Sequence, residues 1–520
     1  MKKIVMTMVW LALMSTGWSE TLCGVEYFGA WANGQGGGYS DGNRWCYPWT
    51  NNEWLPDFPE RTPLYGKFLT QSVMNDHICA ASGNGVDYFK FLWYNIYDGA
   101  GTPAESDLNH GVIYFKDSPE NWRMKFMIEF CNAPDGRGGT FGAANDQQWL
   151  NCCIRWKPFF EKSSYLRVNN KLVFQIHSWD EFYKECNYDL NKAKWRLSHL
   201  RACVKTYWGW GLDMLIGVGV GTNQAINSSH PVVQTGFDWT TSYANIGDSV
   251  YGWGGWVYPY NYMTDIVYNH RLAHFNDAIP YLPIVMVGWD GRPWGYPSQN
   301  RPSYQQPTYN EFKYQLELAK WDTEQHSVYG FPGQPSISIY NWSEYGEGGF
   351  LSPTTGWGFQ NLDAIRYTFG APDIFAGRYS PKNYKSALCL VPEAQSTANG
   401  AKICQWYPAY EIGGEAWWWN FVKLSNGYYK IINFKSGKAL VPDGQSTADG
   451  VRIVQWDYVH NNAWWWEMVF VNNAWSLKNV KSGKYLCIDG QSTAPGAYLI
   501  QWNYINSDSW KWSIDRPWWF

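Results

Sequence analysis

The C-terminal part of the chain contains three copies of one short phrase, and this repeat constrains the fold more than any other feature. The copies begin at Asn383, Asn433 and Asn479, so they are spaced by 50 and 46 residues. Each copy contains Gln-Ser-Thr-Ala, continues to Gln-Trp and closes on Trp-x-Trp. A threefold repeat of this length indicates a small unit that buries its apolar face only by packing against its siblings.

Length and composition place this unit in a larger protein. The 520 residues are too many for one domain and fit two. A net charge of −4 and the lack of a basic block give no reason to expect nucleic acid as a partner. The chain has 36 Trp and 37 Tyr, whose flat apolar faces can build a core or stack on sugar rings.

The first 19 residues read as a secretory signal peptide. Two lysines at positions 2 and 3 precede an apolar run at 4–14 and a small, polar stretch at 15–19. The run is too short for a permanent membrane span, and no later segment reaches 18 apolar residues. The alternative is a buried first helix. We expect a secreted, periplasmic or extracellular protein without a membrane span.

The cysteines predict no metal site. Their number, eleven, is odd, so at least one stays unpaired if the others form disulfides. The Cys152-Cys153 spacing matches no zinc-ligand pattern, and we expect no cofactor. Cys389 and Cys404 lie in one repeat and form one possible bridge.

Residues 20–372 alternate short apolar β runs with helical stretches. Such alternation predicts an α/β domain, a parallel (β/α)₈ TIM-like barrel. The helical stretches are clearest at 180–204 and 309–325. The eight expected strands are 25–31, 86–94, 124–130, 172–177, 214–218, 232–239, 284–289 and 337–342.

Polar and aromatic side chains collect where these strands are expected to end, which is where barrels carry their chemistry. Glu344 and Glu347 follow the last strand in a Gly-rich loop. Cleavage of a glycosidic bond needs one protonated and one ionised carboxyl group, so this pair is the catalytic candidate. The alternative is two solvated loop carboxylates. The candidate substrate-binding residues are Trp93, Tyr94, Glu129, His177, Asp238, Trp239, Trp289, Asp290, Arg292 and Tyr345.

Most of these side chains have a structural alternative. Glu129 is compatible with a sugar hydroxyl or with a structural hydrogen bond, and a lone His177 is often structural. Asp290 and Arg292 can pair with each other and shape their loop. The three tryptophans can be stacking platforms or ordinary core.

Three phrases carry a resemblance to a known family. Residues 337–348 read Ile-Ser-Ile-Tyr-Asn-Trp-Ser-Glu-Tyr-Gly-Glu-Gly, ahead of Leu-Asp-Ala-Ile-Arg at 362–366. With the phrases at 77–94 and 283–293, they resemble in order the barrels of glycoside hydrolase family 99 and of WbsX-like proteins. The resemblance covers about residues 24–370.

This resemblance implies a secreted, retaining, endo-acting α-glycosidase. By position, Glu344 would assist attack by the sugar's own 2-hydroxyl through an anhydro-sugar intermediate, and Glu347 would be the general acid/base. The chain departs from family 99 in Tyr345-Gly346 between the two Glu residues and Gly348-Gly349 after them.

The repeats at 378–520 resemble the ricin-type β-trefoil lectins, an all-β fold in which each repeat offers a shallow sugar pocket. The Asp position of that family holds Val391, Val441 and Cys487 here, and an acid follows two residues later in every copy. The second Trp of each Trp-x-Trp fits a trefoil core, whereas the Gln residues suit sugar contact or strand pairing equally. The candidate lectin residues are Glu393, Gln405, Trp406, Asp443, Gln455, Trp456, Asp489, Gln501 and Trp502.

Together these features predict a monomeric, secreted glycoside hydrolase that binds a polysaccharide or glycan through an appended trefoil. Two other classes stay open: a non-catalytic carbohydrate-binding protein with a degenerate barrel, and a WbsX-type glycosyltransferase. An export signal speaks against the glycosyltransferase, because nucleotide-sugar donors are cytoplasmic.

Overall fold

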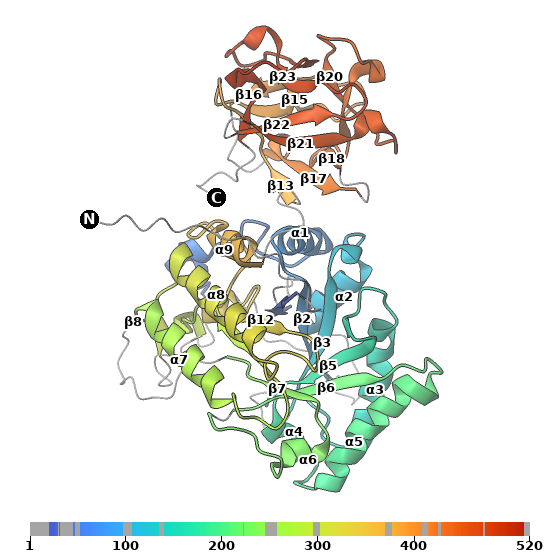
Figure 1. The fold of residues 1–520 in the computed structure, drawn as a ribbon, viewed down its shortest axis with the longest axis vertical. Helices are drawn as coiled ribbons and strands as arrows, with labels where there is room; N and C mark the ends of the chain where they lie inside the picture. The colour runs from blue at the N-terminus through green and yellow to red at the C-terminus, as the bar shows by residue number, and fades with distance from the viewer. Residues whose placement is uncertain are drawn as a thin grey trace, which may run out of the picture.

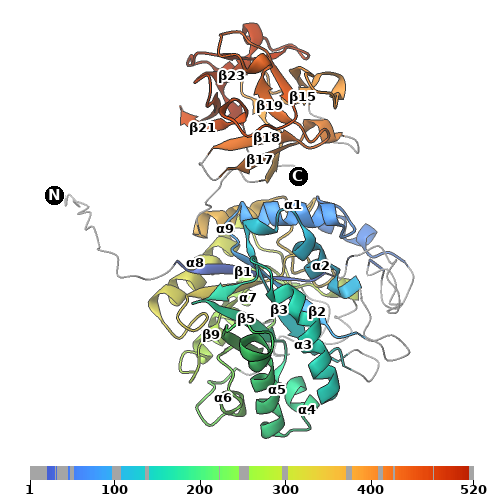
Figure 2. The ribbon, with the colours of Figure 1, turned by 90° about the vertical axis from the view of Figure 1, so that its right-hand side faces the viewer.

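The computed structural model describes two units within one chain. The described residues are 20–29, 31, 45–46, 52–96, 107–134, 140–221, 223–244, 257–294, 302–369, 377–407, 414–424, 428–471 and 474–513. Figure 1 and Figure 2 show an α/β unit and a separate all-β unit that contains the repeats. The predicted signal peptide at 1–19 lies outside the described residues.

The first unit is built on a parallel, barrel-like sheet. Its strands pair in the order β10-β12-β1-β2-β3-β5-β6-β7-β9. Only Pro283 separates β9 from β10, while β9 pairs with β7 and β10 pairs with β12, so the two ends of this order meet. The parallel strands are β1 (Leu22–Tyr27), β2 (Tyr88–Tyr94), β3 (Lys125–Cys131), β5 (Lys171–Ile176), β6 (Met214–Gly219), β7 (Trp239–Thr241), β9 (Tyr281–Leu282), β10 (Ile284–Met286) and β12 (Ser336–Tyr340).

Three short strands lie outside this parallel order. Strand β4 (Arg167–Val168) pairs antiparallel with β5, and β8 (Val257–Tyr258) pairs with β11 (Ser303–Tyr304). Helices surround the sheet in Figure 1. They are α1 (Gln71–Ser82), α2 (His110–Asp117), α3 (Asp146–Phe160), α4 (Trp179–Glu185), α5 (Leu190–Ala202), α6 (Pro231–Thr235), α7 (Tyr260–Ala273), α8 (Tyr309–Gln325) and α9 (Gln360–Phe369). Among the helices of the described residues, none is both long and apolar enough to cross a membrane.

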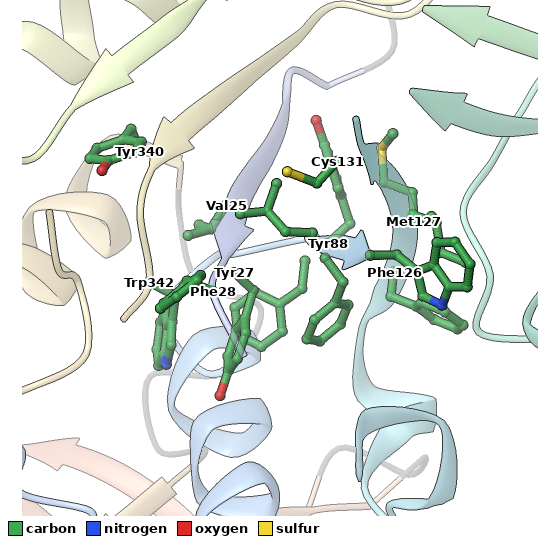
Figure 3. Packing of buried hydrophobic residues seen from close by; sticks show 14 of the residues in the cluster. Val25, Tyr27, Phe28, Tyr88, Phe126, Met127, Cys131, Tyr340 and Trp342 are labelled. Carbon is green, nitrogen blue, oxygen red and sulfur yellow. The ribbon is translucent and has the colours of Figure 1, made fainter. Parts of the chain in front are cut away.

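The outer face of the sheet is aromatic. Because side chains alternate along a strand, every second residue of β1, β2 and β3 points toward the helices. Phe115 of α2, for example, lies 5.4 Å from Phe91 and 5.0 Å from Phe126, ring centre to ring centre. Figure 3 shows Tyr27 and Phe126 of this outer face, together with inward-facing side chains such as Tyr88.

The interior of the sheet is filled at one end by large rings above glycines. The ring of Tyr88 occupies the space that a side chain at Gly24 would need, and Trp239 does the same at Gly217. Phe331 completes this layer, with its ring centre 5.0 Å from that of Trp239. The barrel-like sheet is therefore packed, not open, at the amino ends of its strands.

All eight expected strand ranges overlap a strand of this sheet, but the range 232–239 does so only at Trp239 and is wrong over the rest of its length. Residues 231–235 form helix α6, and β7 begins only at Trp239. His230 caps the helix by accepting a hydrogen bond from the amide of Val232, Pro231 begins it, and Gly236 ends it at φ 93°. These end signals override the β preference of the two valines.

The helical predictions differ in accuracy. The range 309–325 is confirmed as α8, which begins with a capping box between Thr308 and Glu311. The range 180–204 is interrupted, because Asn187 and Tyr188 adopt positive φ and Asp189 caps a new helix. It therefore contains most of α4, all of α5 and the first part of a π-helical segment, Cys203–Tyr207.

The second unit is all-β, as the repeats predict. Each copy contributes four strands, and the copies are joined into one sheet through the pairs β17–β18, β21–β22 and β25–β14. The strands are β13 (Gly377–Tyr379), β14 (Lys382–Asn383), β15 (Cys389–Pro392), β16 (Ile403–Trp406), β17 (Trp419–Lys423), β18 (Tyr429–Asn433), β19 (Ala439–Pro442), β20 (Ile453–Trp456), β21 (Trp466–Val471), β22 (Ala474–Asn479), β23 (Tyr485–Ile488), β24 (Leu499–Trp502) and β25 (Trp512–Ser513).

The core of this unit repeats with the sequence. The second Trp of each Trp-x-Trp is fully buried, which confirms the prediction for these residues. The indole N–H groups of Trp419, Trp466 and Trp512 donate to the carbonyls of Leu390, Leu440 and Leu486, at 3.2, 3.0 and 3.2 Å. The possible Cys389–Cys404 bridge is not formed, because Cys389 faces Trp406 across the hairpin and Cys404 faces Val391.

We predict that Gly217→Ala destabilises the first unit. The new methyl group would lie 2.1 Å from the buried Trp239 ring, and overpacking of this kind costs about 1–3 kcal/mol. The matched control is Gly221→Ala, at a position with nothing within 4 Å of the new atom. Thermal unfolding of the full chain should show a lower midpoint for the first variant only; equal midpoints would contradict the packing described above.

Candidate functional site

Glu344 and Glu347 lie together in a tight loop after β12, in a short 3₁₀ turn whose residues are Tyr345–Glu347. Both carboxylates are buried, in contrast to the alternative of two solvated side chains. Glu344 and Gly349 exchange backbone hydrogen bonds of 2.9 and 3.1 Å, which close the loop. Gly348 has φ 74°, and a side chain there would lie 2.6 Å from the amide of Asp290, so this turn requires glycine.

Aromatic side chains surround the two carboxylates. The hydroxyl of Tyr340 donates a hydrogen bond to Oε2 of Glu347. The ring centre of Tyr243 lies 5.1 Å from that of Tyr340 in an edge-on contact, and the ring centre of Trp289 lies 5.7 Å from that of Tyr340. Burial and then the charges of Glu344 and Glu347 raise the pKa of Tyr243 well above its ordinary value, so this phenol stays protonated.

His177, which follows β5, adds a side chain from a fourth strand to the same site. Its ring lies 4.7 Å from that of Tyr243, and its side chain is 15% exposed. Its Nδ1 lies 2.7 Å from Oε1 of Glu129, which fixes the orientation of the imidazole. The site therefore presents two carboxylates, an imidazole and two phenols at the carboxyl ends of the strands.

Beneath His177, a charged network fills the interior of the sheet. The ammonium group of Lys90 lies 2.7 Å from Glu26 and 3.2 Å from Glu129, and it donates to Gln175 at 3.2 Å. Burial raises the pKa of Glu26 to about 8, although Lys90 opposes the shift. Burial acts on Glu129 too, but the charge of Lys90 and the hydrogen bond with His177 hold its pKa below the ordinary value. Glu129 is thus the ionised partner of Lys90.

Glu129 itself is fully buried, so the structure supports the structural alternative for this residue. Its oxygens face Lys90 and His177, and it positions the imidazole. Sequence reasoning missed Glu26 and Lys90. The available signal was a charged residue within each of two apolar β runs, at positions that turn out to face each other across the pair.

A buried arginine braces the loops of the site. Arg61 pairs with Asp290 and donates to the carbonyls of Asp290 and Tyr345, at 3.1 and 3.0 Å. Arg292 also binds the carboxylate of Asp290, at 2.7 and 2.8 Å, which confirms the predicted Asp290–Arg292 pair. Although burial opposes it, the hydrogen bond from Arg292 and the charges of both arginines hold the pKa of Asp290 below its ordinary value.

The brace reaches Glu347 directly, because the amide of Asp290 donates to the Glu347 carbonyl at 2.6 Å. Arg61 escaped sequence reasoning because it precedes Asp290 by 229 residues and belongs to no motif.

Three of the aromatic or acidic candidates lie elsewhere. Trp93 points outward, where its ring lies 5.5 Å from Trp156 of α3, so it is core and not a platform in the site. Asp238 and Trp239 stand at the amino end of β7, opposite to the predicted placement. Asp238 binds Arg201 at 2.7 Å, and Trp239 fills the lower layer of the sheet. The wrong placement of Asp238 and Trp239 follows from the wrong strand prediction at 232–239.

Tyr345 lies in the loop of the two glutamates but turns toward a buried aromatic cluster. Its ring stacks on Trp45 at 5.6 Å and meets Trp31 at 5.3 Å. Tyr94 instead occupies the inward-facing phase of β2, at the carboxyl end of this strand. Trp289 and Tyr94 therefore remain beside the candidate site, whereas Tyr345 supports it from outside.

In the repeat unit, the three glutamines are structural. The amide of Gln405 donates to the carbonyls of Ser492 and Ala494, at 3.0 and 2.9 Å, and its oxygen accepts from Ser386 at 2.7 Å. Gln455 and Gln501 are fully buried and make the equivalent bonds. Each glutamine reaches into the Gln-Ser-Thr-Ala loop of another copy, so the three copies are locked in a ring.

Two of the three shifted acids, Glu393 and Asp489, link neighbouring copies, whereas the backbone contact of Asp443 lies within its own copy. Glu393 accepts a hydrogen bond from the hydroxyl of Tyr498, and Asp489 pairs with Arg452 at 2.6 Å. The amide of Asp443 donates to the carbonyl of Arg452 at 2.9 Å. A sugar-binding role for the three acids stays a prediction.

The positions that carry Asp in the related lectins are buried and apolar here. Val391, Val441 and Cys487 each belong to a small apolar cluster below the hairpins. In contrast, the indoles that follow the glutamines are accessible to solvent: Trp406, Trp456 and Trp502 are 45%, 44% and 40% exposed. The exposed indoles, not the former Asp positions, are the accessible feature of each copy.

Comparison with known proteins identifies this second unit. Residues 365–456 match the family of ricin-type β-trefoil lectin domain-like proteins. This part of the chain therefore carries a carbohydrate-binding, ricin-type β-trefoil lectin domain. No curated protein matches the chain.

Solved structures also share segments with the chain. ThreeFoil, a designed protein of threefold symmetry, is 33% identical over 26% of this chain and 98% of its own, with a TM-score of 0.25. The exo-β-1,3-galactanase of Clostridium thermocellum is 27% identical over 28% of this chain and 30% of its own, with a TM-score of 0.25. The Rhizoctonia solani agglutinin is 20% identical over 27% of this chain and 95% of its own, with a TM-score of 0.24.

We predict that Glu26→Gln weakens the pH dependence of stability. The pKa of Glu26 is about 8 in the folded protein against 4.5 ordinarily. Its contribution to the free energy of unfolding is therefore fully present below pH 4.5 and decreases as the pH rises toward 8. Denaturant unfolding across this window should give a flatter profile for the variant.

The control for this measurement is Glu161→Gln, which changes an exposed glutamate at the end of α3. Its profile should follow that of the unmodified chain. If Glu26→Gln also follows the unmodified chain, the charged network does not titrate as described.

Proposed function

We propose that the chain is a secreted glycoside hydrolase, in which a (β/α)₈ barrel cleaves a polysaccharide that the trefoil holds. The observation that carries the proposal is the placement of Glu344 and Glu347. Both carboxylates are buried in one loop at the carboxyl end of β12, among Tyr340, Tyr243 and His177. Paired carboxyl groups in such a place suit glycosidic cleavage.

In this proposal, Glu347 is the general acid/base and Glu344 assists the attacking hydroxyl of the sugar. The hydrogen bond from Tyr340 orients the carboxyl group of Glu347. The amide of Asp290 holds the carbonyl of Glu347, and Arg61 holds the carbonyl of Tyr345 in the same loop. His177, positioned by Glu129, is available to hydrogen-bond a substrate hydroxyl. An α-linked substrate, endo action and retention of configuration come from the resemblance to family 99 alone.

The trefoil would contribute by attachment. Once the lectin domain holds the polymer, the second contact becomes intramolecular, which raises the local concentration of cleavable bonds without changing the chemistry. Export to the cell exterior, proposed from residues 1–19, would place both domains where polysaccharides occur.

We predict that Glu347→Gln and Glu344→Gln each lower the rate of hydrolysis by roughly 10²–10⁴-fold, because each removes a group that transfers or accepts a proton. The substrates are soluble mannan, galactan, dextran and xylan, and the readout is the appearance of reducing ends. Glu161→Gln is the control and should keep full activity.

Three outcomes separate the competing functions. Unchanged hydrolysis in both active-site variants would remove Glu344 and Glu347 from the mechanism. Binding of a polysaccharide without hydrolysis would favour a non-catalytic carbohydrate-binding protein. Activity that depends on an added nucleotide sugar would favour a glycosyltransferase.

A further inference from the structure

The three exposed tryptophans of the trefoil are not equivalent, although the sequence around them repeats. The Cζ3 ring atom of each indole lies near a glycine of another copy: Trp456 near Gly400, Trp502 near Gly450 and Trp406 near Gly496. Each therefore stands at a junction between two copies, with the rest of its ring exposed. What differs is the set of polar groups beside the ring.

The junction at Trp456 carries an ordered polar cluster. Asp457 accepts a hydrogen bond from Asn399 at 2.7 Å on one oxygen and from Lys438 at 2.7 Å on the other. The amide of Asp457 donates in turn to the side-chain oxygen of Asn399, at 2.9 Å. The side chain of Asp457 is nevertheless 69% exposed, so its remaining lone pairs face solvent beside the indole.

The junction at Trp502 has the same design with different residues. Lys484 pairs with Asp449 at 2.6 Å and donates to Asn503 at 3.3 Å. Asn503 donates to Asp449 at 3.1 Å, which closes the cluster. A carboxylate, an amide and an ammonium group are again held next to a half-exposed ring.

The junction at Trp406 lacks these groups. Leu388, Tyr407 and Pro495 occupy the positions of the Lys, of the residue after Trp, and of the residue before Gly. Leu388 is buried and Tyr407 is exposed. This junction offers an apolar surface with one phenol in place of the carboxylate–amide–ammonium cluster.

We propose that the junctions at Trp456 and Trp502 are two sugar subsites, and that the junction at Trp406 is not one. The inference rests on the proposed carbohydrate-binding function and states where on the trefoil that binding occurs. The ligand class is a sugar ring with adjacent hydroxyl groups: the indole stacks on the apolar face of the ring, while the polar cluster binds the hydroxyls.

The physical reason is preorganisation. In each cluster the donors and acceptors are already hydrogen-bonded to one another. Binding two adjacent sugar hydroxyls therefore requires few further side chains to become ordered. Each Lys has three N–H donors, and the carboxylate oxygens have further lone pairs. Hydrogen bonds from Asn399 and then Lys438 hold the pKa of Asp457 below its ordinary value, which keeps this acceptor ionised.

The clusters also tie adjacent copies together, and a purely structural role is the competing explanation. Such a role accounts for Asn399 and Asp457 but not for the exposed indole beside them. The experiment must therefore remove the indole ring and leave the hydrogen bonds between the copies unchanged. The same Trp→Ala substitution can be made at all three junctions.

The test uses the full chain with Trp456→Ala, Trp502→Ala and their double variant, against Trp406→Ala as the matched control. The probes are soluble mannan, galactan, dextran and xylan in affinity electrophoresis. For the polymer that retards the unmodified chain, we expect each single variant to bind roughly tenfold more weakly. We expect the double variant to lose retardation and Trp406→Ala to retain it.

Asp457→Ala tests the polar cluster, with Tyr407→Ala as its counterpart at the third junction. Weaker binding by the first variant alone, with an unchanged thermal midpoint, supports the subsite. Equal loss in Trp406→Ala and Trp456→Ala, or full binding by the double variant, overturns the inference while leaving carbohydrate binding intact. If the unmodified chain binds none of the probes, the proposed function and the inference fail together.

Discussion

The buried ammonium group of Lys90 sets a condition that the whole first unit must satisfy. A charge without exposure to solvent is tolerated only when partners surround it, so β1, β2, β3 and β5 must bring Glu26, Glu129 and Gln175 to the same level. A slip of one residue in any of these strands would turn its polar side chain outward among the aromatic rings below the helices. The network thereby specifies the register of half of the sheet. Through Glu129 it also orients His177, which connects the interior of the sheet to the candidate active site.

The trefoil satisfies a similar condition with neutral groups. Each of its three buried glutamines donates hydrogen bonds to two backbone carbonyls in a loop of another copy. These bonds are needed because a buried amide without partners would lower the stability of the fold. Because the bonds run from each copy to another around the ring, no copy completes its own core. This explains why the glutamines, which sequence reasoning left between sugar contact and structure, are unavailable to a ligand. In our proposal, the sugar is therefore recognised by side chains at the junctions between copies.

The comparison between sequence and structure separates what local patterns can and cannot predict. Apolar runs located most strands, because burial on both faces of a parallel sheet leaves a strong local signal. The range 232–239 failed where a cap, a proline and a glycine outweighed two valines. The error moved Asp238 and Trp239 to the wrong end of a strand and hid Tyr243, which follows the true strand. Glu344 and Glu347 were located correctly, because the Gly-rich loop and the strand before it are adjacent in sequence.

The sequence by itself determined the threefold repeat, the β character of that unit, the buried second tryptophans and the candidate glutamate pair. These features follow from periodicity and from neighbours along the chain. Tertiary structure alone decided that Trp93 faces a helix, that Arg61 braces the loop of Glu347, and that Trp456 and Trp502 stand beside polar clusters while Trp406 does not. In each case the partners are distant in sequence, and a side chain acquires its environment only when the folded sheets bring those partners to it.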